Sequence, residues 1–142
     1  MLHTGVFDEL TAATLYAILR LRAEVFVVEQ ACAYLDPDGR DLEPGTRHCW
    51  FAADDGEVQA YLRITAEAHD EHRIGRVVTA PAARGRGLAA DLMRHALTLV
   101  PGTVILHAQA QLLSYYAGFG FFPHGSPFFE DDIPHVPMRL AR

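Results

Sequence analysis

The sequence predicts an α/β fold built on one mixed β-sheet. Three observations point to it: two β-rich runs flank an Asp-Gly turn early in the chain, a strand, a helix and a second strand follow one another later, and 50% of the 142 residues are hydrophobic. A chain of this length and composition can bury one core but not two. We therefore expect a single domain over residues 1–142.

The first half of the chain predicts a strand, a helix and a hairpin. Residues 2–7 favour a strand, and Asp8 or Thr11 can cap the helix that follows. The apolar residues of that helix fall on one face: Leu15, Ile18, Leu19, Val25 and Phe26. The runs at 48–53 and 58–65 flank the Asp-Gly turn, which indicates two antiparallel strands.

The second half predicts a strand, a helix and a second strand in succession. Residues 73–79 favour a strand, 88–99 an amphipathic helix, 103–108 a strand and 112–118 a short helix. The tail alternates as a last strand does, with one face formed by Val136, Met138 and Leu140. Two strands joined through a helix must be parallel and connected by a right-handed crossover, so the sheet is mixed.

The turn before the amphipathic helix is typical of a phosphate-binding site. It reads Arg84-Gly85-Arg86-Gly87-Leu88-Ala89. The two glycines permit positive φ and a close approach of the backbone to a ligand, and the first free N–H groups of the helix point at an anion. The arginines add positive charge at any working pH. The alternative is an ordinary strand-to-helix turn with solvated arginines.

Two common phosphate loops are excluded. A P-loop needs a lysine, and the chain contains none. The dinucleotide fingerprint Gly-x-Gly-x-x-Gly has two residues between its second glycine and its last small residue. Here only Leu88 separates Gly87 from Ala89. What remains is the pattern Arg/Gln-x-x-Gly-x-Gly/Ala, which Arg84, Gly87 and Ala89 satisfy. This pattern resembles the acetyl-coenzyme A pyrophosphate loop of the GNAT acetyltransferase superfamily.

The resemblance covers nearly the whole chain. Other segments follow the order seen in the ElaA-type branch of the superfamily: VFVVEQ at 25–30 with Cys32, Asp38-Gly39 with Asp41, RVVT at 76–79, AQA at 108–110, YAGFGF at 116–121 and EDDIPH at 130–135. One departure is Asp132, where the branch usually has Gly. The resemblance implies a central, mostly antiparallel sheet with one parallel strand–helix–strand unit, and helices on both faces.

The resemblance also implies that this turn binds acetyl-coenzyme A, the acetyl donor. Main-chain N–H groups of residues 84–89 would bind its pyrophosphate, and its pantetheine arm would pair along a strand that splays from its parallel neighbour. A backbone N–H near Val78 would face the thioester oxygen as oxyanion donor. The expected donor-binding residues are Val77, Val78, Thr79, Arg84, Gly85, Arg86, Gly87, Leu88, Ala89 and Gln109.

Tyr116 is the expected proton donor to the departing thiolate. Its pattern Tyr-x-x-Phe-Gly-Phe matches the family's Tyr-x-x-x-Gly-Phe, in which that tyrosine lies beside the sulfur. A phenol with a pKa of about 10 suits this task. The alternative is a packing role within its aromatic cluster.

The general base must come from outside the strand before the turn, which contains no acid, unless water carries the proton. The available residues are Glu29, His48, His107, Glu130 and His135. We assign Glu29 and His48 to the catalytic set. The apolar run before Glu29 is expected to raise its pKa, and His48 begins a strand expected near the site. The alternative for each histidine is a structural or surface role.

The implied function is N-acetylation, in which an amine attacks the thioester directly in a ternary complex. The acceptor is a small-molecule or peptide amine, and acidic clusters at 36–43, 54–57 and 130–132 favour a cationic one, unless they only aid solubility. The alternative is a non-catalytic acyl-coenzyme A binding module that regulates a partner. The resemblance is also compatible with a homodimer.

Charge and composition argue against other classes of protein. The net charge is −6 and no basic cluster is longer than the arginine turn, which argues against a nucleic-acid partner. No signal peptide or membrane-spanning run is visible, so no membrane partner and a cytoplasmic location are expected. Cys32 and Cys49 are expected to be free thiols.

No metal is expected. Residues 31–47 favour a loop, and the acids around its Gly39 lack the spacing of a calcium site, so we expect a solvated turn there. His69 and His72, with two acids and no thiol beside them, are weak evidence for zinc.

Overall fold

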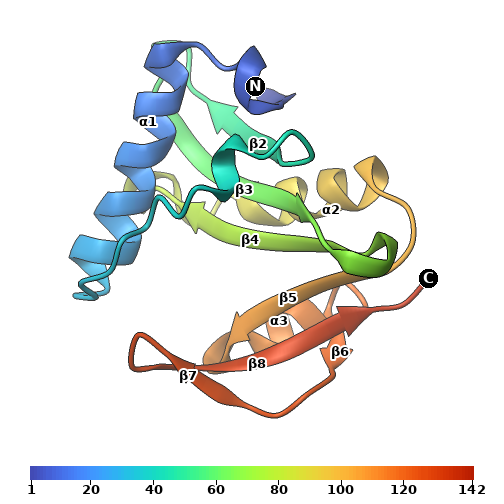
Figure 1. The fold of residues 1–142 in the computed structure, drawn as a ribbon. Coiled ribbons are helices and arrows are strands. Elements are labelled where there is room, and N and C mark those ends of the chain that lie inside the picture. Colours follow the sequence, from blue (N-terminus) through green and yellow to red (C-terminus); the bar gives the residue numbers. More distant parts are fainter.

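The computed structural model describes all of residues 1–142. One eight-stranded sheet has the order β1-β2-β3-β4-β5-β8-β6, and β7 also pairs with β8 (Figure 1). Its strands are β1 (Leu2–Gly5), β2 (Arg47–Ala52), β3 (Val58–Ala66), β4 (His72–Thr79), β5 (Val104–Gln109), β6 (Phe122–Pro123), β7 (Phe128–Glu130) and β8 (Ile133–Leu140). Only β4 and β5 are parallel. The predicted mixed, mostly antiparallel sheet is confirmed.

Helices cover both faces of the sheet, as expected. α1 (Ala12–Arg22) crosses one face, and α2 (Leu88–Leu99) and α3 (Leu113–Ala117) lie behind the other (Figure 1). Thr11 caps α1, because its hydroxyl accepts a hydrogen bond from the N–H of Thr14 at 3.1 Å. α1 continues as a π-helix over Ala23–Glu29. The remaining turns are 3₁₀ helices at Phe7–Glu9, Arg40–Leu42, Ala68–Asp70, Pro81–Ala83 and Ala110–Leu112.

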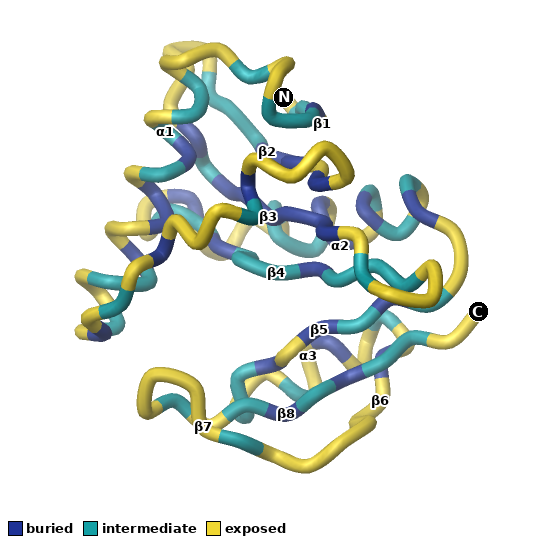
Figure 2. The backbone as a smooth tube through the Cα atoms, viewed as in Figure 1, coloured by how far each residue is buried: buried dark blue, intermediate teal, exposed yellow.

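Two hydrophobic clusters hold these layers together. The larger contains Leu62 of β3 with Leu92 and Met93 of α2, and the smaller contains Tyr61 of β3 with Ile18 of α1. Successive residues of a strand point to opposite faces, so β3 contributes to both clusters and is buried along most of its length (Figure 2).

The sheet opens between its two parallel strands. β4 and β5 pair only at their beginnings, His72 with Val104 and Arg73 with Ile105, and then diverge (Figure 1). A bulge in β4 accompanies this bend, because the β3–β4 register shifts there and Arg76 adopts a left-handed φ of +53°. The splay that the family resemblance implies is confirmed, and it creates the space for a site.

Small boundary differences have local causes. β1 ends at Gly5, earlier than expected, because the chain turns into a 3₁₀ helix at Phe7. β6 and β7 have no counterpart among the predicted strands, since so few residues cannot display a period.

Candidate active site

The phosphate turn has the backbone geometry that its glycines predict. Gly85 and Gly87 adopt φ angles of +83° and +73°. A Cβ at Gly87 would meet no atom within 4 Å, so the backbone conformation rather than the available space favours glycine. Gly87 precedes α2 and offers no capping side chain to the N–H groups of Leu88 and Ala89. These groups are therefore available to an anion.

Arg84, which begins this turn, pairs with Glu29 at the end of the π-helix. Its Nη1 donates to Glu29 Oε2 at 2.7 Å, and both side chains stay almost half exposed. This hydrogen bond lowers the pKa of Glu29. The expected rise is therefore wrong: the neighbouring Val28 is 73% exposed and gives no apolar cover.

A cavity of about 470 Å³ occupies the opening between β4 and β5. Val77 of β4 and Gln109 of β5 lie on its walls, and Tyr116 of α3 lines it as well. The chain after the π-helix and the β7–β8 hairpin complete its lining. The cavity thus brings together three of the expected site residues, and β4 continues from it to the phosphate turn. Glu29 and His48 are not among its lining residues.

Tyr116 combines features of a packed aromatic residue with those of a proton donor. Its ring packs edge-on against Tyr115 and Phe121, with centroids 5.1 and 6.4 Å away. The residue is only 7% exposed, and burial raises the pKa of its phenol to about 12. Its hydroxyl has no hydrogen-bond partner in the protein, although the side chain lines the cavity. A protonated phenol is therefore held where a ligand can meet it.

His48 lies in the packed interior on the α1 side of the sheet. Its Nδ1 is 2.6 Å from the hydroxyl of Tyr61, and its Nε2 is 3.1 Å from the backbone oxygen of Asp41. The residue is fully buried, and burial lowers its pKa. The strand position expected for His48 is right. The residue does not line the cavity, and neighbouring groups occupy both of its ring nitrogens.

A buried ion-pair network takes the place of the expected solvated turn. Arg22 of α1 is fully buried and contacts Asp36 and Asp41, each at 2.8 Å. Arg63 of β3 contacts Asp38 at 2.6 Å and Asp41 at 3.1 Å. The hydrogen bonds from Arg63 hold the pKa of Asp38 well below its usual range. The acids of this loop therefore neutralise buried arginines.

Arg76, at the bulge of β4, joins the same network. Its Nε is 2.8 Å from Asp36 Oδ1, which also accepts a hydrogen bond from the Tyr34 hydroxyl at 2.9 Å. The network thus ties the loop to α1, β3 and β4, beside the cavity. One sequence signal could have found it: Arg22 follows Ile18 by four residues and so lies on the buried face of the helix.

A second polar cluster, formed by Glu67, Arg40 and Arg73, determines which ring nitrogen of His107 accepts a hydrogen bond on the cavity wall. Glu67 accepts hydrogen bonds from Arg40 at 2.7 Å and from Arg73 at 3.0 Å. Arg73 Nη1 is also 2.9 Å from His107 Nε2. Since arginine can only donate, this nitrogen is the acceptor. Burial, assisted by the charge of Arg73, lowers the pKa of His107.

His135 of β8, also on the cavity wall, has the opposite arrangement. Its Nδ1 lies 2.7 Å from the backbone oxygen of Ile133, and its ring stacks on Phe128 with centroids 5.6 Å apart. A carbonyl oxygen can only accept, so Nδ1 carries the hydrogen and Nε2 of the neutral ring keeps a lone pair. Nε2 has no partner in the protein.

Comparison with known proteins places the chain in a family. The model of the acetyltransferase (GNAT) domain matches residues 21–142. The chain belongs to the GNAT acetyltransferase family. Within this family it is 47% identical over 134 residues to a UPF0039 protein of Mycobacterium tuberculosis, covering 92% of this chain and 86% of the relative.

Two solved structures confirm the fold, and the first of them also confirms the branch. The crystal structure of Escherichia coli ElaA matches with a TM-score of 0.91 and 38% identity, and it covers 99% of both chains. That of an acyl-CoA N-acyltransferase from Pseudomonas aeruginosa matches with a TM-score of 0.93 and 42% identity, again over 99% of both chains. Membership of the GNAT family supports acyl transfer from an acyl-coenzyme A.

Three further observations bear on other expectations. Cys32 and Cys49 are both free and buried, as expected. No group of three or more His, Cys, Asp or Glu side chains is arranged to hold a metal ion. None of the helices combines the length and the apolar character needed to cross a bilayer.

Proposed function

We propose that the protein is an acetyl-coenzyme A dependent N-acetyltransferase, in which an acceptor amine attacks the thioester directly in a ternary complex. The observation that carries the proposal is the cavity in the split sheet, which Tyr116 lines from α3 and from which β4 leads to the phosphate turn. Donor and acceptor can meet there without a covalent enzyme intermediate. A cytoplasmic location and a small-molecule or peptide acceptor belong to the same proposal, as does assembly as a homodimer.

The register of β4 selects the backbone groups that would face the donor. The N–H of Ala80 donates to the backbone oxygen of Gln59, just before β3 residue Ala60, at 2.8 Å. Because N–H groups alternate between the two sides of a strand, that of Val78 also points to β3, and those of Val77 and Thr79 point to the split. We therefore assign the oxyanion role to Val77, which lines the cavity, in place of Val78.

Two side chains on the cavity wall would move the protons. The amine nitrogen attacks the carbonyl carbon, the C–S bond breaks, and Tyr116 gives its phenolic proton to the departing thiolate. His135 takes the proton of the amine at Nε2, directly or through a water. Proton transfer from His135 to Tyr116 through solvent restores both groups. His107 is unsuited to this task because Arg73 occupies its Nε2.

Tyr116→Phe tests the proposal, because it keeps the packed ring and removes the proton donor. The assay measures release of the coenzyme A thiol from acetyl-coenzyme A in the presence of a panel of primary amines. We expect turnover to fall by about 10²-fold or more, with unchanged coenzyme A affinity in calorimetry. Tyr115→Phe is the matched control: it removes the neighbouring hydroxyl, which does not line the cavity.

The outcomes separate an enzyme from a binding module. Equal turnover in Tyr116→Phe and the unaltered protein would remove Tyr116 from the mechanism. Binding of coenzyme A without acetylation of any amine would favour the non-catalytic module instead.

A further inference from the structure

The charged side chains around the cavity are paired, with two exceptions. Each arginine on its wall forms an ion pair at 3.0 Å or less: Arg40, Arg63, Arg73 and Arg76. Asp38, also on the wall, is paired with Arg63. Glu130 and Asp131 line the cavity as well and form no ion pair. They leave two negative charges without compensation.

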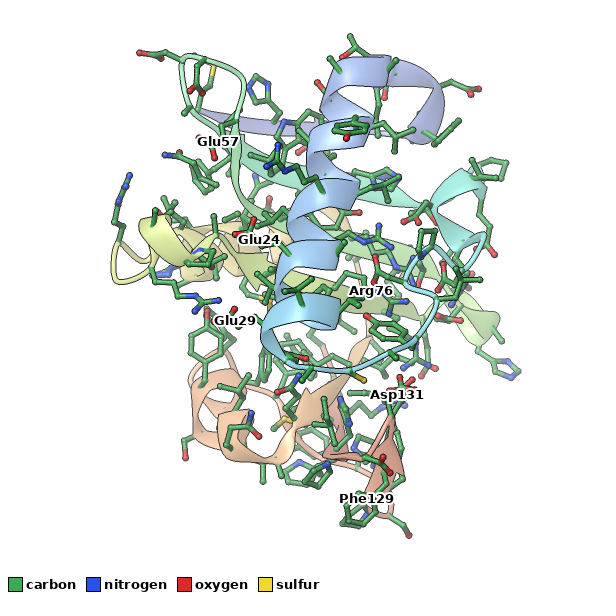
Figure 3. All side chains as sticks on the ribbon, turned by 90° about the vertical axis from the view of Figure 1, so that its left-hand side faces the viewer. Glu24, Glu29, Glu57, Arg76, Phe129 and Asp131 are labelled. Carbon is green, nitrogen blue, oxygen red and sulfur yellow. The ribbon has the colours of Figure 1, made fainter.

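These two carboxylates lie at the rim of the cavity. Glu130 ends β7, and Asp131 begins the turn into β8. The Cys32 thiol donates a hydrogen bond to the backbone oxygen of Asp131 at 3.5 Å, so the hairpin tip contacts the chain that follows the π-helix (Figure 3). A ligand that enters between this hairpin and β4 passes the two carboxylates.

The negative charges of Glu130 and Asp131 affect the pKa of groups on two sides of the cavity, on β5 and on the loop after the π-helix. On β5, the charge of Glu130 opposes the lowering of the His107 pKa by burial and Arg73. On the loop, burial raises the pKa of the Cys32 thiol, and the negative charge of Asp131 raises it further. Burial and Arg73 outweigh Glu130 at His107, so a cation would be stabilised at the hairpin itself, beside the two carboxylates.

The other acidic clusters of the sequence do not serve the cavity in this way. The acids at 36–43 are bound to the buried and wall arginines. Those at 54–57 belong to the turn between β2 and β3, and Glu57 lies at the opposite end of the molecule from Asp131 (Figure 3). Only Glu130 and Asp131 are both at the cavity and unpaired.

We propose that the acceptor is a small diamine or polyamine, which is acetylated at one amine while a second, protonated amine binds to Glu130 and Asp131. This inference rests on the proposed function. The hydroxyl of Tyr116, in a residue only 7% exposed, has no hydrogen-bond partner in the protein and marks a second polar point in the same cavity with which a ligand group can bond. A cavity of about 470 Å³ has the size of a small-molecule site. A monoamine would leave both carboxylates without a partner.

Calorimetry on the protein saturated with coenzyme A tests the inference without requiring turnover. The probes are α,ω-diaminoalkanes of graded length and the n-alkylamines of the same lengths. We expect the best diamine to bind about ten-fold more tightly than its monoamine, since each partly exposed ion pair contributes up to about five-fold. In the doubly substituted E130Q/D131N protein the two probes should bind alike.

Glu57→Gln is the matched control, because it removes one exposed acid at the far hairpin and should keep the preference for the diamine. Thermal unfolding verifies that the variants are folded. Equal affinity for diamine and monoamine in the unaltered protein overturns the inference, and so does a preference that survives in E130Q/D131N. The proposed function fails separately if coenzyme A does not bind to the unaltered protein before any amine is added.

Discussion

At the scale of single residues, the tautomer of His135 decides whether the cavity contains a general base. The backbone oxygen of Ile133 holds the hydrogen on Nδ1, and stacking on Phe128 holds the ring. His107 lies on the same wall, but Arg73 occupies its Nε2. Glu29, the carboxylate assigned from the sequence, is bound to Arg84 outside the cavity. His135 therefore offers the free lone pair that the proposed mechanism needs.

His135→Gln should slow acetyl transfer at neutral pH by about 10²-fold, because it removes the basic nitrogen and keeps a polar side chain of similar reach. Turnover should recover partly at high pH, where more of the acceptor amine arrives already deprotonated. The measurement is the pH profile of thiol release with the best amine of the panel. His124→Gln, which replaces an exposed histidine outside the cavity, should leave the profile unchanged. A uniform loss at all pH values would assign His135 a structural role.

At the scale of elements, the β7–β8 hairpin depends on a strained turn. Asp131 and Asp132 form its two-residue loop, with φ angles of +50° and +62°. Positive φ at both central residues is the geometry of a type I′ turn, which prefers glycine at its second position. The turn therefore forms although Asp132 stands where the ElaA-type branch usually has Gly. Its left-handed conformation costs free energy, because the Cβ of the aspartate is crowded by the backbone.

Asp132→Gly should therefore stabilise the protein by about 0.5 kcal/mol, the difference between the relieved left-handed strain and the larger entropy that glycine loses on folding. Urea unfolding provides the free energy of unfolding. The converse change in the other hairpin is the control: Gly56 has a φ of +87°, and Gly56→Ala should destabilise by about 1 kcal/mol. A loss of stability in Asp132→Gly would mean that the aspartate side chain supports the turn.

Elements with a clear local pattern can be predicted from the sequence, and long-range polar contacts cannot. The period of residues 88–99 predicts α2, and the glycines before it predict the left-handed turn, because both depend on neighbouring residues only. The loop at 31–47 is different. Its acids contact Arg22 and Arg63, which lie on α1 and β3. The spacing of Arg22 from Ile18 indicates a buried arginine, but nothing in the sequence indicates which acids would pair with it.

The candidate site follows the same rule. The left-handed backbone of the turn is predictable because its glycines act locally, whereas the cavity position of Tyr116 is expected from the family motif that it matches. The positions of Glu29 and His48 are not, because an ion pair with Arg84 and a hydrogen bond to Tyr61 decide where these side chains lie. A glycine turn determines its own backbone conformation, whereas a lone acid or histidine is positioned by residues that are distant in the sequence.

At the scale of the whole molecule, the donor and the acceptor of the proposed reaction would meet in the split between β4 and β5. One strand leads to the turn that would bind the pyrophosphate, and the other bears the histidine and glutamine of the cavity wall. The larger hydrophobic cluster contains Ile74 of β4 and Leu106 of β5 together with α2, and the smaller cluster joins Val78 of β4 to α1. The proposed function thus depends on one claim, that the turn after β4 binds the donor.

Calorimetric titration of coenzyme A into the unaltered protein and into Gly87→Val tests this claim. Gly87 has a φ of +73° beside the proposed pyrophosphate site, and Gly56→Val is the control because Gly56, in a distant turn, also has a positive φ, of +87°. We expect the unaltered protein and Gly56→Val to bind, with a melting temperature that rises with ligand, and Gly87→Val to lose at least about ten-fold in affinity. No heat of binding for the unaltered protein at millimolar coenzyme A, or equal binding by Gly87→Val, would contradict the claim.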